Sequence, residues 1–193
     1  MKSITEILRE RGGIIKASEL ESRAEYRRVL RAVERGEVVR LHHGVYAEAS
    51  YLLNNMIDVE KIVPDGVVCL YNAWAYHNLS MTVPPAFCIA IEATRKVCVN
   101  GSIPINLYLW KKENLEFGIE KYDVSGFSVR MTDMERSVCD AIKYRNKVGT
   151  EQCAEVVNNY LKKKERNISK LVEYANKLKV GKVLNNYLEI ALQ

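Results

Sequence analysis

The chain has 193 residues, of which 48% are hydrophobic and 27% are charged, a balance typical of a folded globular protein rather than a disordered one. No apolar run approaches the roughly 18 residues of a membrane span, and the N-terminal residues lack the apolar core of a signal peptide, so we expect a cytoplasmic protein with no membrane partner. The net charge of +5 is compatible with nucleic-acid binding without being diagnostic of it.

The first 36 residues predict three short helices. Apolar residues spaced three and four apart indicate a helix over 3–11, which the glycines at 12 and 13 end. A second short helix is expected over 17–20. A third begins after Ser22, because Ser22 and Glu25 have the spacing of a reciprocal capping box. Three helices with such tight connections favour a helix-turn-helix.

The third helix divides into an apolar and a basic side. At 100° per residue, one side gathers the residues that we expect to pack on the first two helices: Tyr26, Val29, Leu30 and Val33. The opposite side gathers arginines: Arg27, Arg28, Arg31 and Arg35, with Arg23 at its N-terminal edge. Such a face fits the major groove of DNA, where arginine contacts guanine edges or phosphates. The alternative is a solvated face whose arginines pair with nearby glutamates.

A two-stranded hairpin is predicted directly after this helix. Residues 38–41 read as a strand, 42–44 as a turn and 45–47 as a returning strand, which together are the wing of a winged helix. Arg40, His42 and His43 are placed near its tip to contact the DNA backbone or minor groove, and Lys16 is a candidate phosphate contact. The alternative, a metal bound by the histidines, lacks a third ligand nearby, so we expect no metal and no cofactor.

These elements resemble the N-terminal domain of AbiEi-type antitoxins, the transcriptional repressors of type IV toxin–antitoxin (abortive infection) systems. The resemblance rests on residues 13–20, the arginine helix and the segments Gly36–Leu41 and His43–Ala47. It continues more weakly at Asn72–Ser80 with Pro84, and at a helix start containing Glu135, Arg136, Ser137 and Asp140. The resemblance implies a regulator that represses its own operon and a functional partner that is a nucleotidyltransferase-type toxin, with no stable complex required.

The remaining chain predicts a mixed second domain. After a linker and short helix over 48–62, strand-like runs are expected at 67–70, 87–91, 96–99, 105–110 and 127–130, with a helix at 72–77. A helix over 134–144 is expected to be capped by a box of Thr132 and Glu135, with Arg136 and Asp140 paired on one face. Three more helical patterns follow. The sequence therefore predicts an α+β protein with a winged helix-turn-helix at 1–50 and a mixed α/β domain at 51–193 that ends in a helical bundle.

The other candidate residues give weaker indications of a functional site. Asp65, Glu92 and Lys96 have poor spacing for a nuclease, and His77 has no nucleophile beside it, so we expect no enzyme. The five cysteines lie among apolar neighbours and are expected to be buried thiols. A basic run is either a solvated helix end or a second phosphate-binding patch: Lys162, Lys163, Lys164 and Arg166, with Lys170, Lys177 and Lys179 as extensions.

The pattern as a whole predicts a sequence-specific repressor. Its partner is double-stranded operator DNA, and its binding there prevents transcription. The alternative is a winged-helix interaction module that neutralises a protein partner by direct contact.

Overall fold

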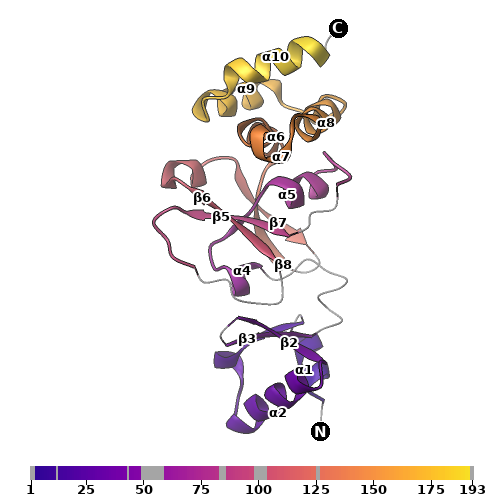
Figure 1. Cartoon of the computed structure of the whole chain (residues 1–193), viewed down its shortest axis with the longest axis vertical. Coiled ribbons are helices and arrows are strands. Elements are labelled where there is room, and N and C mark those ends of the chain that lie inside the picture. The colour runs from indigo at the N-terminus through magenta and orange to yellow at the C-terminus, as the bar shows by residue number, and fades with distance from the viewer. Residues whose placement is uncertain are drawn as a thin grey trace. The chain divides into compact units, whose positions relative to one another are not determined.

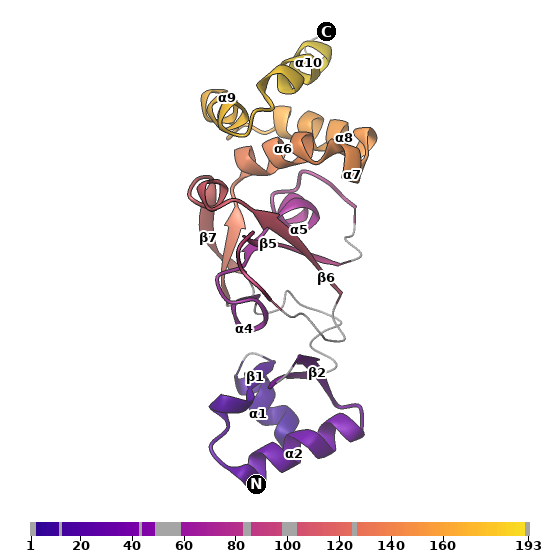
Figure 2. The same cartoon turned by 60° about the vertical axis from the view of Figure 1, so that its left-hand side comes forward.

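The computed structural model describes residues 3–11, 13–42, 44–48, 59–82, 86–97, 104–124 and 127–191 (Figures 1 and 2). The chain divides into two compact units. The first comprises Met1–Gly66, Thr94–Ile105 and Tyr122–Val129, and the second comprises Val67–Ala93, Asn106–Lys121 and Arg130–Gln193. The boundary predicted at residue 50 falls within 49–58, outside the described residues, and stays a prediction.

The first unit has the element order of a winged helix-turn-helix. The elements are α1 (Ile4–Glu10), β1 (Ile14–Lys16), the short helix η1 (Ala17–Glu19), α2 (Arg23–Glu34), β2 (Val38–His42), β3 (Val45–Glu48) and α4 (Val59–Ile62). The strands form an antiparallel sheet in the order β1-β3-β2. The three predicted helical segments and the predicted hairpin are confirmed. Strand β1 was not predicted, and it pairs with β3 so that Ile15 lies opposite Tyr46.

A small apolar core holds this unit together. It contains buried residues from both helices and all three strands: Ile4, Leu8, Ile15, Val29, Ala32, Val38 and Tyr46. Two polar contacts fasten its edges. Arg9 of α1 donates from Nε to Glu48 Oε2 at 2.9 Å, and Lys61 of α4 donates to the carbonyl of Ile14 at 3.0 Å. Because the core spans helix and sheet, the orientation of α2 is fixed by packing within the unit.

The second part of the fold is built on a mixed five-stranded sheet in the order β6-β5-β4-β8-β7. Strand β4 is antiparallel to β5 and parallel to β8. The elements are β4 (Val67–Val68), α5 (Leu70–Tyr76), β5 (Phe87–Glu92), β6 (Ile105–Trp110), the short helix η2 (Lys112–Leu115), β7 (Ile119–Val124) and β8 (Phe127–Thr132). The α+β class is confirmed.

Two strand predictions in this region need correction. Strand β7 was missed, because its alternating polar residues give little apolar signal at the edge of the sheet. The strand predicted at 96–99 is wrong where the structure describes it, since residues 96–97 have no regular structure. Strand β5 already has β4 and β6 as neighbours, so no free edge remains beside it for that segment.

Five helices follow the sheet, so the predicted C-terminal group of helices is present. They are α6 (Met134–Lys143), α7 (Arg145–Val148), α8 (Thr150–Leu161), α9 (Ile168–Lys177) and α10 (Gly181–Ala191). Figures 1 and 2 show α6 beside α5, with α8, α9 and α10 beyond it. The core of this part includes Trp74, Trp110 and four free cysteines, Cys69, Cys88, Cys139 and Cys153. None of the described helices is long and apolar enough to cross a membrane.

The predicted cap of α6 is wrong. Asp133, not Thr132, is the N-cap, and its carboxylate accepts a hydrogen bond from the Arg136 amide at 2.8 Å. Thr132 is the last residue of β8, and its hydroxyl bonds that of Ser137 at 2.8 Å. The Thr132 hydroxyl is engaged by Ser137, and the amide of Ser137 donates to the carbonyl of Asp133 at 2.8 Å, so the helix starts one residue later than predicted.

Candidate nucleic-acid interface

Helix α2 begins at a side-chain cap. The Ser22 hydroxyl accepts a hydrogen bond from the Glu25 amide at 3.2 Å, as predicted. The reciprocal half of the box is wrong, because the Glu25 carboxylate accepts from the amide of Glu21 at 2.9 Å instead of Ser22. Either arrangement satisfies an amide near the helix start and fixes where α2 emerges from the preceding turn.

The buried side of α2 is rotated from the predicted one. Val29 and Ala32 are fully buried and Val33 packs beside them, whereas Tyr26 and Leu30 are 38% and 37% exposed. Ala32, which the periodicity argument left out, belongs to the buried side of α2. The predicted apolar side is therefore correct for Val29 and Val33, whereas Tyr26 meets Tyr46 of β3 and Leu30 is partly exposed.

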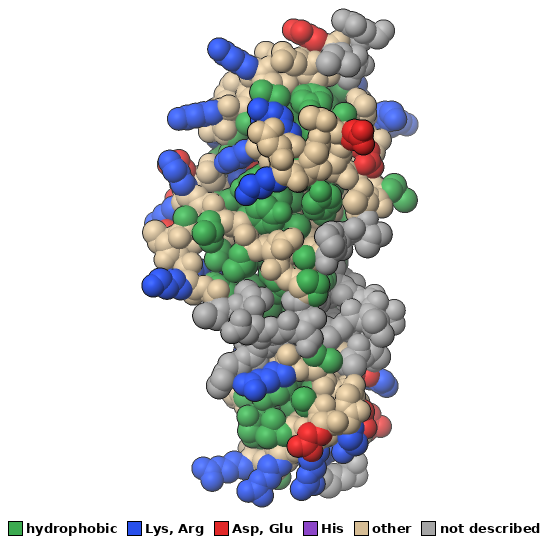
Figure 3. All heavy atoms as spheres, viewed as in Figure 1, with side chains coloured by type: hydrophobic (Ala, Val, Ile, Leu, Met, Phe, Trp, Pro, Cys, Tyr) green, Lys and Arg blue, Asp and Glu red, His purple; other side chains and the backbone are tan. Residues whose placement is uncertain are grey.

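A row of arginines runs along the outer side of α2. Arg23, Arg27 and Arg31 are exposed and are spaced four residues apart, so they lie one above another on the helix. Among the residues that the structure describes, these three have no ion pair or side-chain hydrogen bond. Figure 3 shows Lys and Arg side chains gathered along the edge of the first unit where α2 lies (compare Figure 1). This row is a cationic surface available to an anionic partner.

The other two predicted arginines of α2 are engaged. Arg28 is half-buried and has a partner within the protein. Arg35 donates from Nε to Glu37 Oε1 at 2.8 Å and from its terminal nitrogen to Glu37 Oε2 at 3.0 Å. This two-pronged hydrogen bond lowers the pKa of Glu37 and raises that of Arg35. An arginine already held by a carboxylate must leave it before it can contact a phosphate.

The wing is present, with part of it undescribed. Arg40 is exposed on β2, whereas the side chain of His42 and all of His43 lie outside the described residues. The wing is fastened to η1, because the carbonyl of Gly44 accepts a hydrogen bond from the Ala17 amide at 2.6 Å. Lys16, at the end of β1, is half-buried. In the described part of the chain no group of three or more His, Cys, Asp or Glu residues is placed to hold a metal.

The predicted C-terminal basic patch lies at the end of α8 and in the loop after it. Lys162, Lys164 and Arg166 are exposed and Lys163 is half-buried. The proposed extensions differ from them. Lys170 is ion-paired with Asp133 at 3.0 Å, which outweighs burial and raises its pKa. Lys177 lies 2.7 Å from Glu173, and Lys179 is exposed.

His77, one of the residues considered for catalysis, has a structural role. His77 ends α5, and its Nε2 lies 2.8 Å from the carbonyl of Thr132, so the ring packs and bonds the neighbouring strand. Arg136 and Asp140 pair as predicted, at 3.1 Å, but in the core and not on an exposed face. Both are helix residues locked by burial, so neither is placed to meet a substrate.

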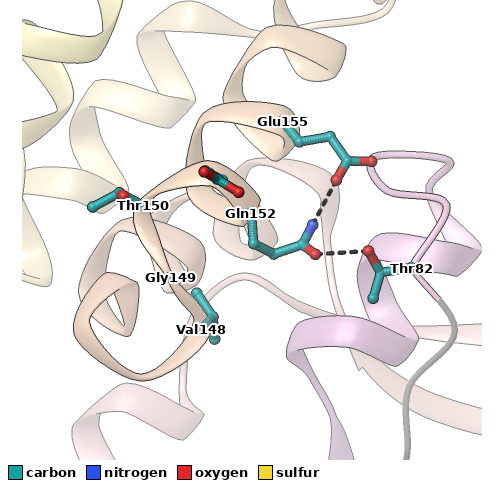
Figure 4. A pocket seen from close by; sticks show the side chains of 7 residues that line it. Thr82, Val148, Gly149, Thr150, Gln152 and Glu155 are labelled. Atoms are coloured by element: carbon teal, nitrogen blue, oxygen red, sulfur yellow. Dashed lines mark hydrogen bonds between the residues drawn. The ribbon is translucent and has the colours of Figure 1, made fainter.

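One hollow in the second unit lies at the start of α8 (Figure 4). It has a volume of about 530 Å³ and its walls include Thr82, Gln152 and Glu155. The Gln152 amide donates to Glu155 Oε2 at 2.9 Å and accepts from the Thr82 hydroxyl at 2.7 Å. These polar groups are bonded to one another, and the carboxylates of Glu151 and Glu155 oppose an anionic ligand. The hollow therefore gives no sign of a site for nucleic acid.

An exposed arginine row on the helix after the turn, followed by a wing, is the arrangement of a transcriptional-regulator domain of the winged helix-turn-helix class. Residues 2–49 match the family model described as transcriptional regulator, AbiEi antitoxin. The N-terminal part of the chain is thus similar to the regulator domain of AbiEi antitoxins, as the sequence resemblance predicted. The match covers about a quarter of the chain. A comparison with curated proteins found no match.

Proposed function

We propose that the protein is a DNA-binding transcriptional repressor that serves as the autoregulating antitoxin of a type IV toxin–antitoxin operon. The observation that carries this proposal is the exposed row of Arg23, Arg27 and Arg31 on α2. Three arginines without partners among the described residues add little to stability, because exposed charges contribute little to folding. They suit a polyanion, to which each adds a strong contact.

The dimensions of α2 support binding in the major groove. A helix with its side chains is about 10–12 Å across, and the major groove is about 12 Å wide. The row from Arg23 to Arg31 extends along about 12 Å of the helix axis, enough to contact successive base pairs or phosphates. Arg40, His42 and His43 in the wing are assigned to the DNA backbone or minor groove, Lys16 to a phosphate, and Arg28 and Arg35 to the flanks of the helix.

The antitoxin role is supported by the description of the matching family model. In this proposal, the repressed operon contains the gene for this protein and a gene for a nucleotidyltransferase-type toxin. The repressor occupies the promoter and excludes transcription, and no stable complex with the toxin is required. No catalytic activity, metal or cofactor is assigned to this chain.

A binding titration tests the proposal. The full chain is titrated against the duplex immediately upstream of its own coding sequence and against a scrambled duplex of equal length. We expect binding that prefers the upstream duplex and weakens steeply with salt, with a log–log slope of about −4.5 if about five phosphates are contacted. Binding to neither duplex at low salt would reject the proposal and favour the alternative, an interaction module for a protein partner.

A further inference from the structure

Helix α2 exposes a second row of side chains beside its arginines. Tyr26 and Leu30 are 38% and 37% exposed and are spaced four residues apart, as are Arg23, Arg27 and Arg31. Residues three and four apart are neighbours on a helix surface, so the two rows run side by side. Leu30, three residues after Arg27, thus lies next to Arg27 on the helix surface, and Arg31 follows it in the chain.

The two residues of the second row differ in how they are held. The Tyr46 hydroxyl donates a hydrogen bond to that of Tyr26 at 3.3 Å, and the two rings meet edge to face with centroids 6.2 Å apart. Tyr26 is therefore tied to the edge of the core. Leu30 is not a member of that core, whose residues from α2 are Val29, Ala32 and Val33. With 37% of its side chain exposed, Leu30 keeps apolar surface that a ligand can contact.

We infer that Leu30 packs against the C5-methyl group of a thymine in the operator, beside a guanine contacted by Arg27 or Arg31. This inference rests on the proposed function. The thymine methyl is the one apolar group on the base edges of the major groove, and apolar side chains read it by contact. Arg27 and Leu30 are about 4.5 Å apart along the helix axis, close to the roughly 3.4 Å between base pairs, so the two residues address neighbouring pairs. The arginines on either side favour duplex DNA over an apolar protein surface as the occupant.

Replacement of thymine by uracil tests the methyl contact directly, because uracil keeps the base pair and removes only the methyl group. The full chain is titrated against the preferred upstream duplex with uracil introduced at one thymine at a time. We expect the affinity of the wild-type protein to fall about fourfold when uracil replaces one particular thymine, the value for one lost methyl contact. The variant Leu30→Ala should bind the unmodified duplex about fourfold or more weakly and should no longer respond to uracil at that position.

The matched control is Leu109→Ala, a change at a leucine of β6 that is 61% exposed. It should leave both the affinity and the response to uracil unchanged. Because alanine is the best helix former, Leu30→Ala should remain folded at the temperature of the titrations, which its thermal midpoint verifies. Specific binding with no uracil-sensitive position, or sensitivity that persists in Leu30→Ala, would overturn the inference and leave the proposed function intact. Absence of specific duplex binding would overturn both.

Discussion

The arginines of α2 and Arg136 of α6 lie in opposite surroundings. Arg27 and Arg31 are exposed and have no partner among the described residues. Arg136 is fully buried between the rings of Trp110 and Phe117, each 4.5 Å from its guanidinium carbon. It donates hydrogen bonds to Asp140 and to the carbonyls of Asn114 and Phe117. The same side chain therefore holds the fold together in one unit and is available for binding in the other.

The lysines of the second unit repeat this contrast within one region. Lys170 is ion-paired with Asp133 at 3.0 Å and Glu135 at 3.5 Å, and so links α9 to the start of α6. Lys162 and Lys164 are exposed at and after the end of α8. Whether a lysine or arginine stabilises the fold or is available to bind a ligand therefore depends on its partners inside the protein. Residue type and local charge alone do not decide it.

The largest effect is expected at Arg136. Arg136→Met should lower the free energy of unfolding by about 3–5 kcal/mol, because it leaves the buried Asp140 carboxylate without its partner. Urea titration followed by tryptophan fluorescence measures this, since both tryptophans, Trp74 and Trp110, lie in the same core. The control Arg27→Met should change this value by less than about 0.5 kcal/mol. A loss below about 1 kcal/mol for Arg136→Met would contradict the structural role assigned to this arginine.

A second substitution sharpens the assignment. Replacing Asp140 as well, in the variant Arg136→Met with Asp140→Leu, removes the unpaired charge and should recover much of the lost stability. If the double variant is as unstable as the sum of both single ones, the cost at Arg136 comes from its packing against the two rings and its carbonyl contacts and not from the ion pair.

A smaller effect is expected on DNA binding. Arg31→Ala should weaken binding to the upstream duplex by about 1–3 kcal/mol and relax the preference over scrambled DNA, because a base contact is lost. Arg35→Ala should cost less, because Arg35 is already held by Glu37 through two hydrogen bonds. Fluorescence anisotropy with both duplexes gives the values. Equal losses for the two variants would break the distinction between free and engaged arginines.

The C-terminal basic patch should contribute without specificity. If Lys162 and Lys164 contact phosphates, the double variant Lys162→Ala, Lys164→Ala should reduce the log–log salt slope by about 2, equally on both duplexes. The matched control is Lys177→Ala, because the Lys177 amine lies 2.7 Å from Glu173. A slope that does not change in the double variant assigns these lysines to a solvated helix end.

The smallest effect concerns pH. Burial lowers the pKa of His77, so the folded protein favours the neutral ring that bonds the Thr132 carbonyl. The unfolded chain takes up a proton near pH 6.5, so stability should fall as the pH drops from about 6.5 to the lower pKa of the folded state. Urea titrations of the wild type and His77→Gln at pH 5 and pH 8 measure this change in the free energy of unfolding. The variant should lose less stability than the wild type on acidification, and an equal loss in both would exclude His77 as the cause.

The sequence predicted the features that depend on local spacing. Helix starts at Ser3 and Ser22, the wing and the arginine row all follow from residues close together in the chain. Strand β1 is different, because three residues become a strand only by pairing with β3, which lies far along the sequence. The outward position of Leu30 also depends on tertiary packing. Periodicity favoured Leu30 for the buried side, whereas Ala32 is fully buried and Leu30 is 37% exposed.

Arg136 shows the same limit. Its spacing from Asp140 predicted the ion pair, yet nothing in those five residues indicates full burial. The surroundings come from Trp110 of β6 and from Asn114 and Phe117 near η2, at least nineteen residues away along the chain. Gly118 also lies so close to the Arg136 side chain that a Cβ atom there would be 2.7 Å from the Arg136 Cβ. This close approach likewise depends on the fold and not on local sequence.

The most direct test of the central claim, that α2 reads operator DNA through its free arginines, is the ratio of affinities for the upstream and scrambled duplexes. It is measured at one salt concentration for the wild type and Arg27→Ala. The account predicts a wild-type preference of at least about a thousandfold, and a preference reduced about tenfold or more in the variant. A wild-type protein without preference, or a variant that keeps the full preference, would contradict it.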